Sequence, residues 1–451
     1  MASAKVSILV CAQPAEGHVS PLSIIAKHLQ SCGYNISFLT GTSYRQKIES
    51  IGLPFVPLIG HADWTLEGIF KSIISGFTTL KLPPGPAQTF YMLEHLFCDT
   101  IPAQHECIQS FMRGAKGPVI VMHDVAFGGA SPVLLGAEGI KPAATIGIGI
   151  NPLCLFDERV PPFGSGLEYD GSYQGRERNK SMRTAMDQGL YSRLNQKYDV
   201  VLESLGASKS LWSFFDAMIL MPDAFLQMCI PGVEYPRSEI PSSLRFAGNI
   251  PQGHREQMKE SEYPEWWPRV TNPSTQVVFV CQGTASRIRF EDLVIPTLEG
   301  LADEDLLVVA SLGKKGATLM SEVPVPKNAH IINYIPYDDI FPHADVFISN
   351  GGYGGFQHAI NHGLPMVIAG LNADKPEVAA RAEWAGVGIN LKTQAASKEA
   401  VRESVLKILS SPKYRARARE LQSEAKTLDS LAIVAKTVEE VVARLEYKTE
   451  G

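Results

Sequence analysis

The sequence lacks several features that would assign it to a familiar class of protein. Its seven cysteines are isolated from one another, with no Cys-x-x-Cys pair and no spacing typical of a zinc site. An odd number of single cysteines indicates reduced thiols and a cytoplasmic location, not a disulfide framework. No apolar run approaches the roughly 20 residues that a membrane-spanning helix needs. We therefore expect neither a disulfide-stabilised domain nor a transmembrane protein.

Basic runs and the common phosphate motifs are also missing. The 41 basic and 47 acidic residues give a net charge of −6 without a long basic run, so nucleic acid is not an expected partner. No Gly-x-Gly-x-x-Gly follows the first apolar run, which argues against a dehydrogenase. The segment 314–316 has the wrong residue order for a Walker A loop. No side chains show metal-ligand spacing, and we expect no metal.

What the chain does contain is a repeated alternation of short apolar runs and helical segments. With 451 residues, of which 45% are hydrophobic, it is long enough for two domains. The first runs flank a helical segment with Ser20 as N-cap, Pro21 as first residue and Gly33 at its end, which predicts a doubly wound sheet. The strands that we expect are 6–11, 36–39, 118–122, 143–148, 217–221, 225–229, 277–281, 306–310, 330–332, 346–348 and 366–369.

A proline-rich stretch divides this alternation into two similar halves. We predict an N-terminal domain at 1–235, a linker at 236–268 and a C-terminal domain at 269–430. The last segment, 431–451, has apolar residues along one side, and we expect a helix that returns to the N-terminal domain.

A glycine-rich turn follows the predicted strand 346–348. Its sequence is Asn350-Gly351-Gly352-Tyr353-Gly354-Gly355, and a helical segment at 355–362 comes next. Glycines let a ligand approach the backbone, and a helix N-terminus offers unpaired N–H groups to an anion. The turn therefore predicts a phosphate or diphosphate site, although the same residues also suit a tight turn without a ligand.

Two polar residues are expected at the carboxyl edge of the N-terminal sheet, where ligands bind in open α/β folds. His18 lies in the loop after the first strand, and Asp124 follows the strand 118–122. A neutral imidazole there could remove a proton from a hydroxyl, and a carboxylate beside it would stabilise the imidazolium. A histidine that only hydrogen-bonds its loop and an aspartate that only caps a turn are the alternative interpretations.

Together these motifs resemble those of the family 1 glycosyltransferases, the UDP-glycosyltransferases with the two-domain GT-B fold, over most of the chain. Gly17-His18 and Asp124 match the family's catalytic histidine and its partner aspartate, and 350–358 matches its nucleotide signature. Asp374-Lys375 falls on the Asp-Gln pair that holds the sugar. The donor-binding residues that the resemblance implies are Gly17, Gly283, Thr284, Tyr334, Ile335, Asn350, Gly351, Gly352, Gly354, Gly355, His358, Asp374 and Lys375.

The resemblance implies an α/β fold of the GT-B type, with two Rossmann-like doubly wound domains facing across a cleft. It assigns acceptor binding to the N-terminal domain and UDP-sugar binding to the C-terminal one. The implied reaction is inverting transfer of a sugar, with glucose as our expectation, from a UDP-sugar to a hydroxyl of a lipophilic phenolic acceptor. His18 would be the general base and Asp124 its partner, and the UDP-sugar is a substrate, not a permanently bound cofactor.

The chain departs from the family pattern at several donor positions. Asn350 replaces histidine, Gly355 replaces serine or threonine, and His358 replaces the ribose-binding glutamate; Tyr334 replaces tryptophan and Lys375 replaces glutamine. These replacements resemble a microbial or fungal branch of the family. Two other functions stay open: a GT-B-fold UDP-sugar epimerase and a non-catalytic nucleotide-sugar binding protein.

Overall fold

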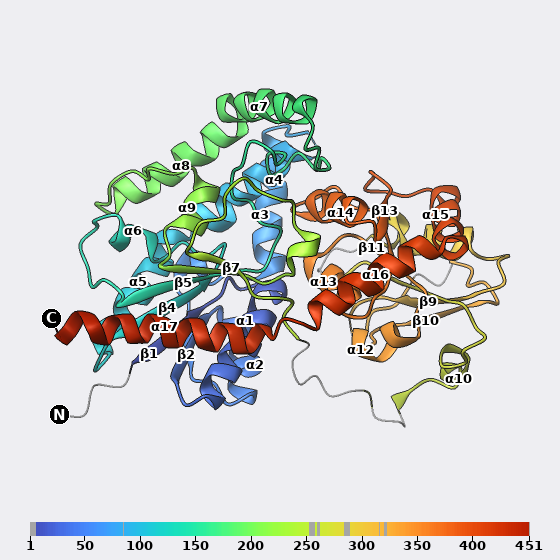
Figure 1. Ribbon diagram of the computed structural model, residues 1–451, viewed down its shortest axis with the longest axis horizontal. Coiled ribbons are helices and arrows are strands. Elements are labelled where there is room, and N and C mark those ends of the chain that lie inside the picture. Colours follow the sequence, from blue (N-terminus) through green and yellow to red (C-terminus); the bar gives the residue numbers. More distant parts are fainter. Residues whose placement is uncertain are drawn as a thin grey trace.

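The computed structural model describes residues 6–83, 85–251, 258, 262–283, 289–314, 316–319 and 323–450. The chain forms two lobes side by side, each built on a parallel sheet with helices packed against it (Figure 1). The strand order is β3-β2-β1-β4-β5-β6-β7 in the N-terminal lobe and β10-β9-β8-β11-β12-β13 in the C-terminal lobe. Two doubly wound α/β domains were predicted, and this prediction is confirmed.

The N-terminal lobe contains the first seven strands and nine α-helices of the described chain. Its strands are β1 (Ser7–Cys11), β2 (Asn35–Thr40), β3 (Phe55–Pro57), β4 (Val119–Asp124), β5 (Ala144–Gly149), β6 (Ala224–Gln227) and β7 (Leu244–Phe246). Its helices are α1 (Glu16–Ser31), α2 (Arg45–Ser50), α3 (Leu66–Thr79), α4 (Pro86–Leu93), α5 (Ile101–Gly114), α6 (Ser131–Leu134), α7 (Tyr173–Gln188), α8 (Leu190–Ser204) and α9 (Phe214–Leu220). A π-helical turn, η3 (Glu94–Cys98), extends α4.

The second lobe repeats the same alternation. Its strands are β8 (Val277–Cys281), β9 (Leu307–Ser311), β10 (Ala329–Ile332), β11 (Val346–Ser349), β12 (Met366–Ile368) and β13 (Gly388–Asn390). The helices that follow the linker are α10 (Trp267–Val270), α11 (Val294–Gly300), α12 (Tyr337–Ile340), α13 (Tyr353–Asn361), α14 (Lys375–Trp384), α15 (Lys398–Ser410), α16 (Pro412–Ala425) and α17 (Ser430–Glu450).

Both faces of each sheet are buried, which explains why the central strands are continuous apolar runs. In β1, Ile8 and Val10 belong to one apolar cluster, whereas Leu9 and Cys11 belong to another on the opposite face. This division follows from the two-residue period of a strand. Helices must therefore cover both faces, which leaves the strand ends as the place for polar chemistry.

Most of the predicted strands are confirmed, with small differences at their ends. The segment predicted as a strand at 217–221 is wrong, because it lies mainly in helix α9. Ser213 caps this helix by accepting the backbone N–H of Asp216, and Phe214, Ala217 and Met218 are buried on one side. A short apolar run fits either structure, and the serine four residues before it was the cue for a helix. Three strands of three residues each, β3, β7 and β13, were not predicted.

The first helix also begins earlier than predicted. Helix α1 starts at Glu16, and Ala15, not Ser20, is the N-cap. The carbonyl of Ala15 accepts the backbone N–H groups of His18 and Val19, each at 2.9 Å. Pro21 therefore lies inside the helix, and His18 lies in its first turn instead of in a loop.

The chain crosses between the lobes twice, and the two crossings lie against each other. The first follows β7, which is the last strand of the N-terminal sheet although it falls within the predicted linker 236–268. The second joins α16 to α17, and α17 runs back across the N-terminal lobe (Figure 1). A Cβ placed on Gly248 would lie 2.7 Å from the Cβ of Leu428, so the two crossings are in contact.

Helix α17 completes the core of the N-terminal lobe. Val434, Val438 and Val441 are almost fully buried and belong to the same apolar cluster as Val19 and Leu22 of α1. Since this cluster also contains residues of β1, the last helix of the chain packs on the first strand and helix.

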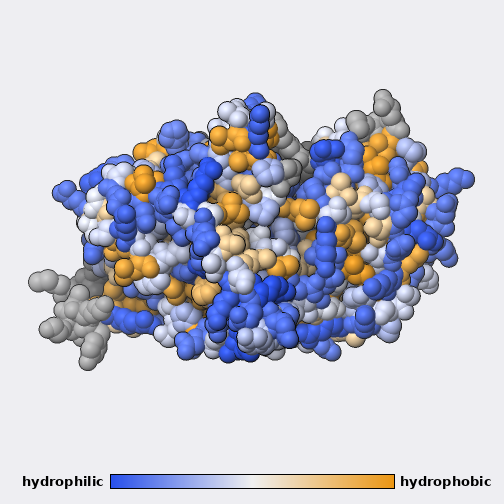
Figure 2. Space-filling view, turned by 90° about the horizontal axis from the view of Figure 1, so that it is seen from above, coloured by the Kyte–Doolittle hydropathy of each residue, from blue (hydrophilic) through white to orange (hydrophobic). Residues whose placement is uncertain are grey.

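The surface is mixed in character. Figure 2 shows small apolar groups separated by polar and charged side chains over both lobes. Among the described residues, no helix combines the length and the apolarity needed to cross a bilayer.

Candidate active site

His18 and Asp124 come together at the carboxyl edge of the N-terminal sheet. Strands β1 and β4 are neighbours, and Cys11 pairs with His123, so their ends lie side by side. The Nδ1 atom of His18 is 3.2 Å from Oδ1 of Asp124. The first turn of α1 therefore places the imidazole directly over the end of β4, with Nε2 as the ring nitrogen that faces away from the carboxylate.

The carboxylate of Asp124 is fixed before any substrate arrives. It is fully buried, and its two oxygens accept the backbone N–H groups of Gln13 and Ala126, each at 2.7 Å. These bonds satisfy an ionised carboxylate in a buried position. Asp124 therefore acts on His18 as a fixed negative charge.

Charge dominates the environment of His18. Its side chain is 21% exposed, and the ring is not aligned for a straight hydrogen bond to Asp124. Burial works against the protonated imidazole, but the carboxylates of Asp124 and, more weakly, Asp374 outweigh burial and raise the pKa of His18. Asp374 belongs to the other lobe, so this site is built from both halves of the chain.

The glycine turn presents a helix N-terminus. Helix α13 begins at Tyr353, with Gly352 as an N-cap that offers no side chain. Gly351 has a φ of +84°, and a Cβ there would lie 3.0 Å from Ile368 and 3.2 Å from the carbonyl of Lys375. Only glycine fits this close approach. Gly354, in the first turn, has open space where a Cβ would point.

The turn after β8 lies beside the glycine turn. The side-chain amide of Asn350 donates to the carbonyl of Gln282, and the same side chain is the nearest neighbour of Gly283. The structure thus brings together Gly283 and the turn that begins at Asn350. Thr284 lies outside the described residues.

Asp374 and Lys375 stand at the start of helix α14. Asp374 is its N-cap residue, and burial raises the pKa of its carboxyl, an effect that Lys375 partly offsets. The side chain of Lys375 lies against the glycine turn, because Cβ atoms added to Gly351 and Gly370 would meet it at 3.3 and 2.8 Å. Burial lowers the pKa of the Lys375 ammonium, and Asp374 opposes this shift. The pair therefore lies beside the glycine turn, and the charge of Asp374 is near enough to act on His18.

The remaining predicted donor residues lie around α12 and α13. Tyr334 and Ile335 follow β10, and Ile335 is buried. His358 lies on α13, and its ring contacts the ring of Tyr337 edge-on at 5.8 Å between centroids. The hydroxyl of Tyr337 would be 3.5 Å from a Cβ on Gly355. His358 therefore belongs to the same face of the lobe as the glycine turn. Gly17 lies in the first turn of α1, next to His18, with open space around its Cβ position.

Two residues of this region were not predicted. Gln13 is fully buried, and besides binding Asp124 through its backbone it donates its side-chain amide to the carbonyl of Ala126 at 2.8 Å. Tyr353 accepts a hydrogen bond at 3.2 Å from Gln227 at the end of β6, which ties α13 to the other lobe. Gln13 could have been identified from its position in the loop just after β1. In contrast, nothing in the sequence indicates that Gln227 and Tyr353 are in contact.

Apolar and aromatic side chains flank His18 on the N-terminal lobe. The ring of Phe97, in the π-helical turn η3, lies 6.5 Å from the imidazole between centroids. Phe97 also packs against the cluster formed by Trp64, Ile73 and Leu96. An apolar cluster therefore extends to the imidazole on this side.

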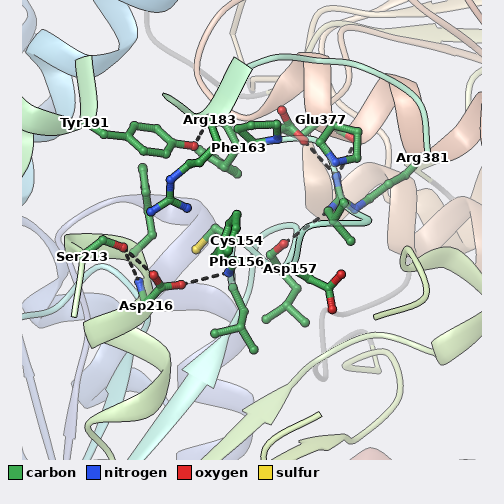
Figure 3. A pocket seen from close by; sticks show the side chains of 16 residues that line it. Cys154, Phe156, Asp157, Phe163, Arg183, Tyr191, Ser213, Asp216, Glu377 and Arg381 are labelled. Atoms are coloured by element: carbon green, nitrogen blue, oxygen red, sulfur yellow. Dashed lines mark hydrogen bonds and ion pairs between the residues drawn. The ribbon is translucent and has the colours of Figure 1, made fainter. Parts of the chain in front are cut away.

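Two hollows occur among the described residues. One, drawn in Figure 3, lies between the segment 153–163 and helix α14 and encloses about 10 Å³, which is room for a single water at most. The other, about 420 Å³, lies beside Asn333 in the C-terminal lobe and is lined mainly by Leu312, Leu319, Val323, Val325 and Ile331. Neither is lined by His18 or Asp124. Within the described ranges, no cluster of three or more His, Cys, Asp or Glu side chains could hold a metal ion.

The relatives found by sequence and by structure are glycosyltransferases. The family model described as "Erythromycin biosynthesis protein CIII-like, C-terminal domain" matches residues 296–441. The chain is 40% identical to UDP-glycosyltransferase 2 of Phaeomoniella chlamydospora, over 98% of this chain and 97% of that protein. It is 36% identical to UDP-glucosyltransferase A1 of Starmerella bombicola, over 98% and 93%. The crystal structure of the kitacinnamycin glycotransferase superposes with a TM-score of 0.69 at 18% identity, covering 96% of this chain and 98% of that one.

Proposed function

Because the chain belongs to the family 1 UDP-glycosyltransferases of the microbial and fungal type and is a UDP-dependent glucosyltransferase with the GT-B fold, we propose an inverting reaction. In this reaction, glucose passes from UDP-glucose to a hydroxyl of a lipophilic phenolic acceptor. The acceptor lies on the N-terminal lobe beside His18, and UDP lies on the C-terminal lobe at the start of α13.

The observation that carries this proposal is the environment of His18. Its Nδ1 lies 3.2 Å from a buried, fully hydrogen-bonded aspartate, which leaves Nε2 to accept a proton. A carboxylate in this position holds the neutral tautomer and stabilises the imidazolium that forms. The approach of Asp374 from the other lobe supports a site at which donor and acceptor meet.

The reaction then follows from the positions of these groups. His18 takes the proton from the acceptor hydroxyl, and the oxygen attacks the anomeric carbon of glucose. The bond from this carbon to the diphosphate oxygen breaks as the new bond forms on the opposite face, so an α-linked donor gives a β-glucoside. The displaced UDP carries the electron pair, and the proton stays on His18 until solvent removes it.

Charge builds up on the diphosphate as it leaves, and the C-terminal lobe offers donors at that place. The first turn of α13 has no side-chain cap, and the Cβ of Lys375 lies close to Gly351 of the same glycine turn. Preorganised N–H groups aimed at developing charge stabilise a transition state more than a ground state. Asn350 is held by the carbonyl of Gln282, so it positions the turn.

The proposal is tested with the purified chain, UDP-glucose and a panel of lipophilic phenols, followed by mass spectrometry of the products. We expect a mass gain of one hexose and a β configuration by NMR. Retention of configuration would overturn the mechanism. A changed sugar in the absence of acceptor would instead identify an epimerase, and tight UDP binding without any product would identify a binding protein.

Replacement of His18 distinguishes a role in proton transfer from a role in UDP binding. His18→Ala should lower turnover by about 100-fold or more, the usual scale for a general base, while UDP binding measured by calorimetry stays unchanged. Near wild-type turnover on a phenol in this variant would exclude His18 as the base.

A further inference from the structure

Helix α14 is attached to the opposite lobe by a buried network of charges. Glu377 and Arg381 lie on this helix, one and two turns after the sugar-binding pair Asp374 and Lys375. Both side chains are about 2% exposed, and Nη1 of Arg381 is 3.1 Å from Oε2 of Glu377. Charged groups are almost never buried to this extent unless they are paired. The partners of Glu377 and Arg381 therefore show which parts of the N-terminal lobe these two residues bind.

Glu377 binds the backbone of the N-terminal lobe. Its Oε1 atom accepts the N–H groups of Gly164 and Gly166, each at 2.9 Å, although more than 200 residues separate them in the chain. Gly166 has a φ of +61°, and a Cβ there would lie 2.7 Å from Pro376. The segment 153–167 therefore touches the first turn of α14 closely and is held there by one carboxylate oxygen.

Arg381 binds a second part of the same lobe. Its guanidinium lies 2.6 Å from Oε1 of Glu234, and it stands over the ring of Tyr235 at 4.4 Å. It also donates to the carbonyl of Leu153 at 3.3 Å. Burial alone would favour neutral Glu234, but Arg381 and Arg237 outweigh burial and lower the pKa of this carboxyl.

The formal charges of this network cancel, because it contains the two arginines Arg237 and Arg381 and the two glutamates Glu234 and Glu377. Glu234 pairs with both arginines, and its Oε1 atom lies 3.7 Å from Nη1 of Arg237. Figure 3 shows Glu377 and Arg381 reaching from α14 toward the segment that carries Asp157 and Phe163. The small hollow of about 10 Å³ at this place confirms that the lobes are in close contact here. One helix thus carries donor-binding residues at its start and an anchor to the acceptor lobe in its next two turns.

We propose that Glu377 and Arg381 are positioning residues for glucosyl transfer: they fix the start of α14, and with it Asp374, opposite His18. This inference rests on the proposed function. On this inference, the network aligns the donor sugar with the acceptor hydroxyl, because Asp374 belongs to one lobe and His18 to the other. A displacement of about 1 Å between reacting groups is enough to slow a reaction by about 100-fold.

Glu377→Gln tests this inference, because the amide oxygen can still accept an N–H bond but no longer balances Arg381. We expect kcat to fall by about 10- to 100-fold and UDP-glucose hydrolysis to rise relative to transfer. The Kd for UDP should stay unchanged, since UDP binds on α13. A merely structural role would lower the melting temperature and leave the ratio of transfer to hydrolysis unaltered.

The matched control is Lys392→Gln. Lys392 also pairs across the lobes, with Glu168 at 3.3 Å, but its side chain is 65% exposed. Exposed pairs contribute little, so this variant should keep the wild-type kcat and ratio. If Glu377→Gln does not fold, Arg381→Lys, which keeps the buried charge, carries the same test.

The outcomes separate the two proposals. A loss of kcat with normal UDP binding and more hydrolysis relative to transfer in either anchor variant supports the positioning role, and a loss of kcat with an unaltered ratio overturns it. Unaltered kcat and transfer ratio in a folded anchor variant overturn it, even when the wild type transfers glucose. Absence of transfer by the wild type itself would overturn the proposed function instead.

Discussion

At the scale of single residues, the proposed chemistry depends on how a few charges are held near one imidazole. Asp124 is fixed by two backbone N–H groups, and the charge of Asp374 acts on the same ring from the other lobe. Both carboxylates raise the pKa of His18 against the effect of burial. A general base must be neutral to accept a proton, so the pH profile of the enzyme should report these charges directly.

Asp124→Asn should change both the rate and the pH profile. Without the carboxylate, the pKa of His18 falls, so the acidic limb of kcat/KM should move to lower pH. Turnover should also fall by about 100-fold or more, because the imidazolium is no longer stabilised. The measurement is kcat/KM between about pH 5 and 9, the range in which histidine titrates.

A second His–Asp pair supplies the control for this prediction. Asp338 lies 3.0 Å from His362, which is the C-cap residue of α13, at the opposite end of this helix from the glycine turn. Asp338→Asn should leave the profile in place. An acidic limb that stays where it was in Asp124→Asn would mean that a group other than His18 sets it.

Asp374→Asn should separate the sugar from the nucleotide. The amide keeps the size of the side chain but weakens the acceptance of sugar hydroxyls, and hydrogen bonds to charged groups contribute about 1.5–3 kcal/mol. We expect the KM for UDP-glucose to rise by about 10-fold or more while calorimetry gives an unchanged Kd for UDP. Equal losses of both would indicate a folding defect.

At the scale of elements, the sequence predicted most strands because their burial on both faces makes them apolar throughout. The strands that escaped prediction have three residues each, too few to show a period. Helix α9 was taken for a strand because its apolar run is short. The glycine turn and the His18–Asp124 contact were predictable, since each depends on residues at strand ends.

Contacts between elements of different lobes could not be predicted in this way. Glu377 and Gly164 share no local pattern, and neither do Gln227 and Tyr353. Their pairing depends on how two separately folded lobes meet, which no single segment encodes. The start of α1 was also missed, because the backbone carbonyl of Ala15 closes the first turn where a side-chain cap was expected.

Tyr353→Phe tests the contact that ties α13 to the N-terminal lobe. The variant removes only the hydroxyl that accepts from Gln227 at 3.2 Å. We expect a loss of about 1 kcal/mol in the free energy of unfolding and weaker UDP binding, because the proposed diphosphate site lies at the start of α13. Denaturant titration and calorimetry measure the two effects. In a Gln227→Met background, Tyr353→Phe should lower the free energy of unfolding no further, because the hydrogen bond is already absent. If Tyr353→Phe lowers it by the same amount in both backgrounds, the two residues do not stabilise the protein through this bond.

At the scale of the whole molecule, the last helix is part of the first lobe. Val438 on α17 is fully buried in the cluster that contains Val19 and Leu22. Val438→Ala should therefore destabilise the N-terminal lobe by about 2 kcal/mol, through lost burial and the cavity left behind. Denaturant unfolding checks this value. Glu439→Ala, at the exposed neighbouring position, should leave the transition within about 0.5 kcal/mol of wild type.

The two crossings between the lobes have a mechanical consequence. They touch where Gly248 meets Leu428, so both covalent connections pass through one narrow place. A single connection would leave one lobe free to rotate relative to the other, whereas two adjacent connections restrict this rotation. We expect this restricted twisting of one lobe against the other to favour a reproducible alignment of Asp374 with His18.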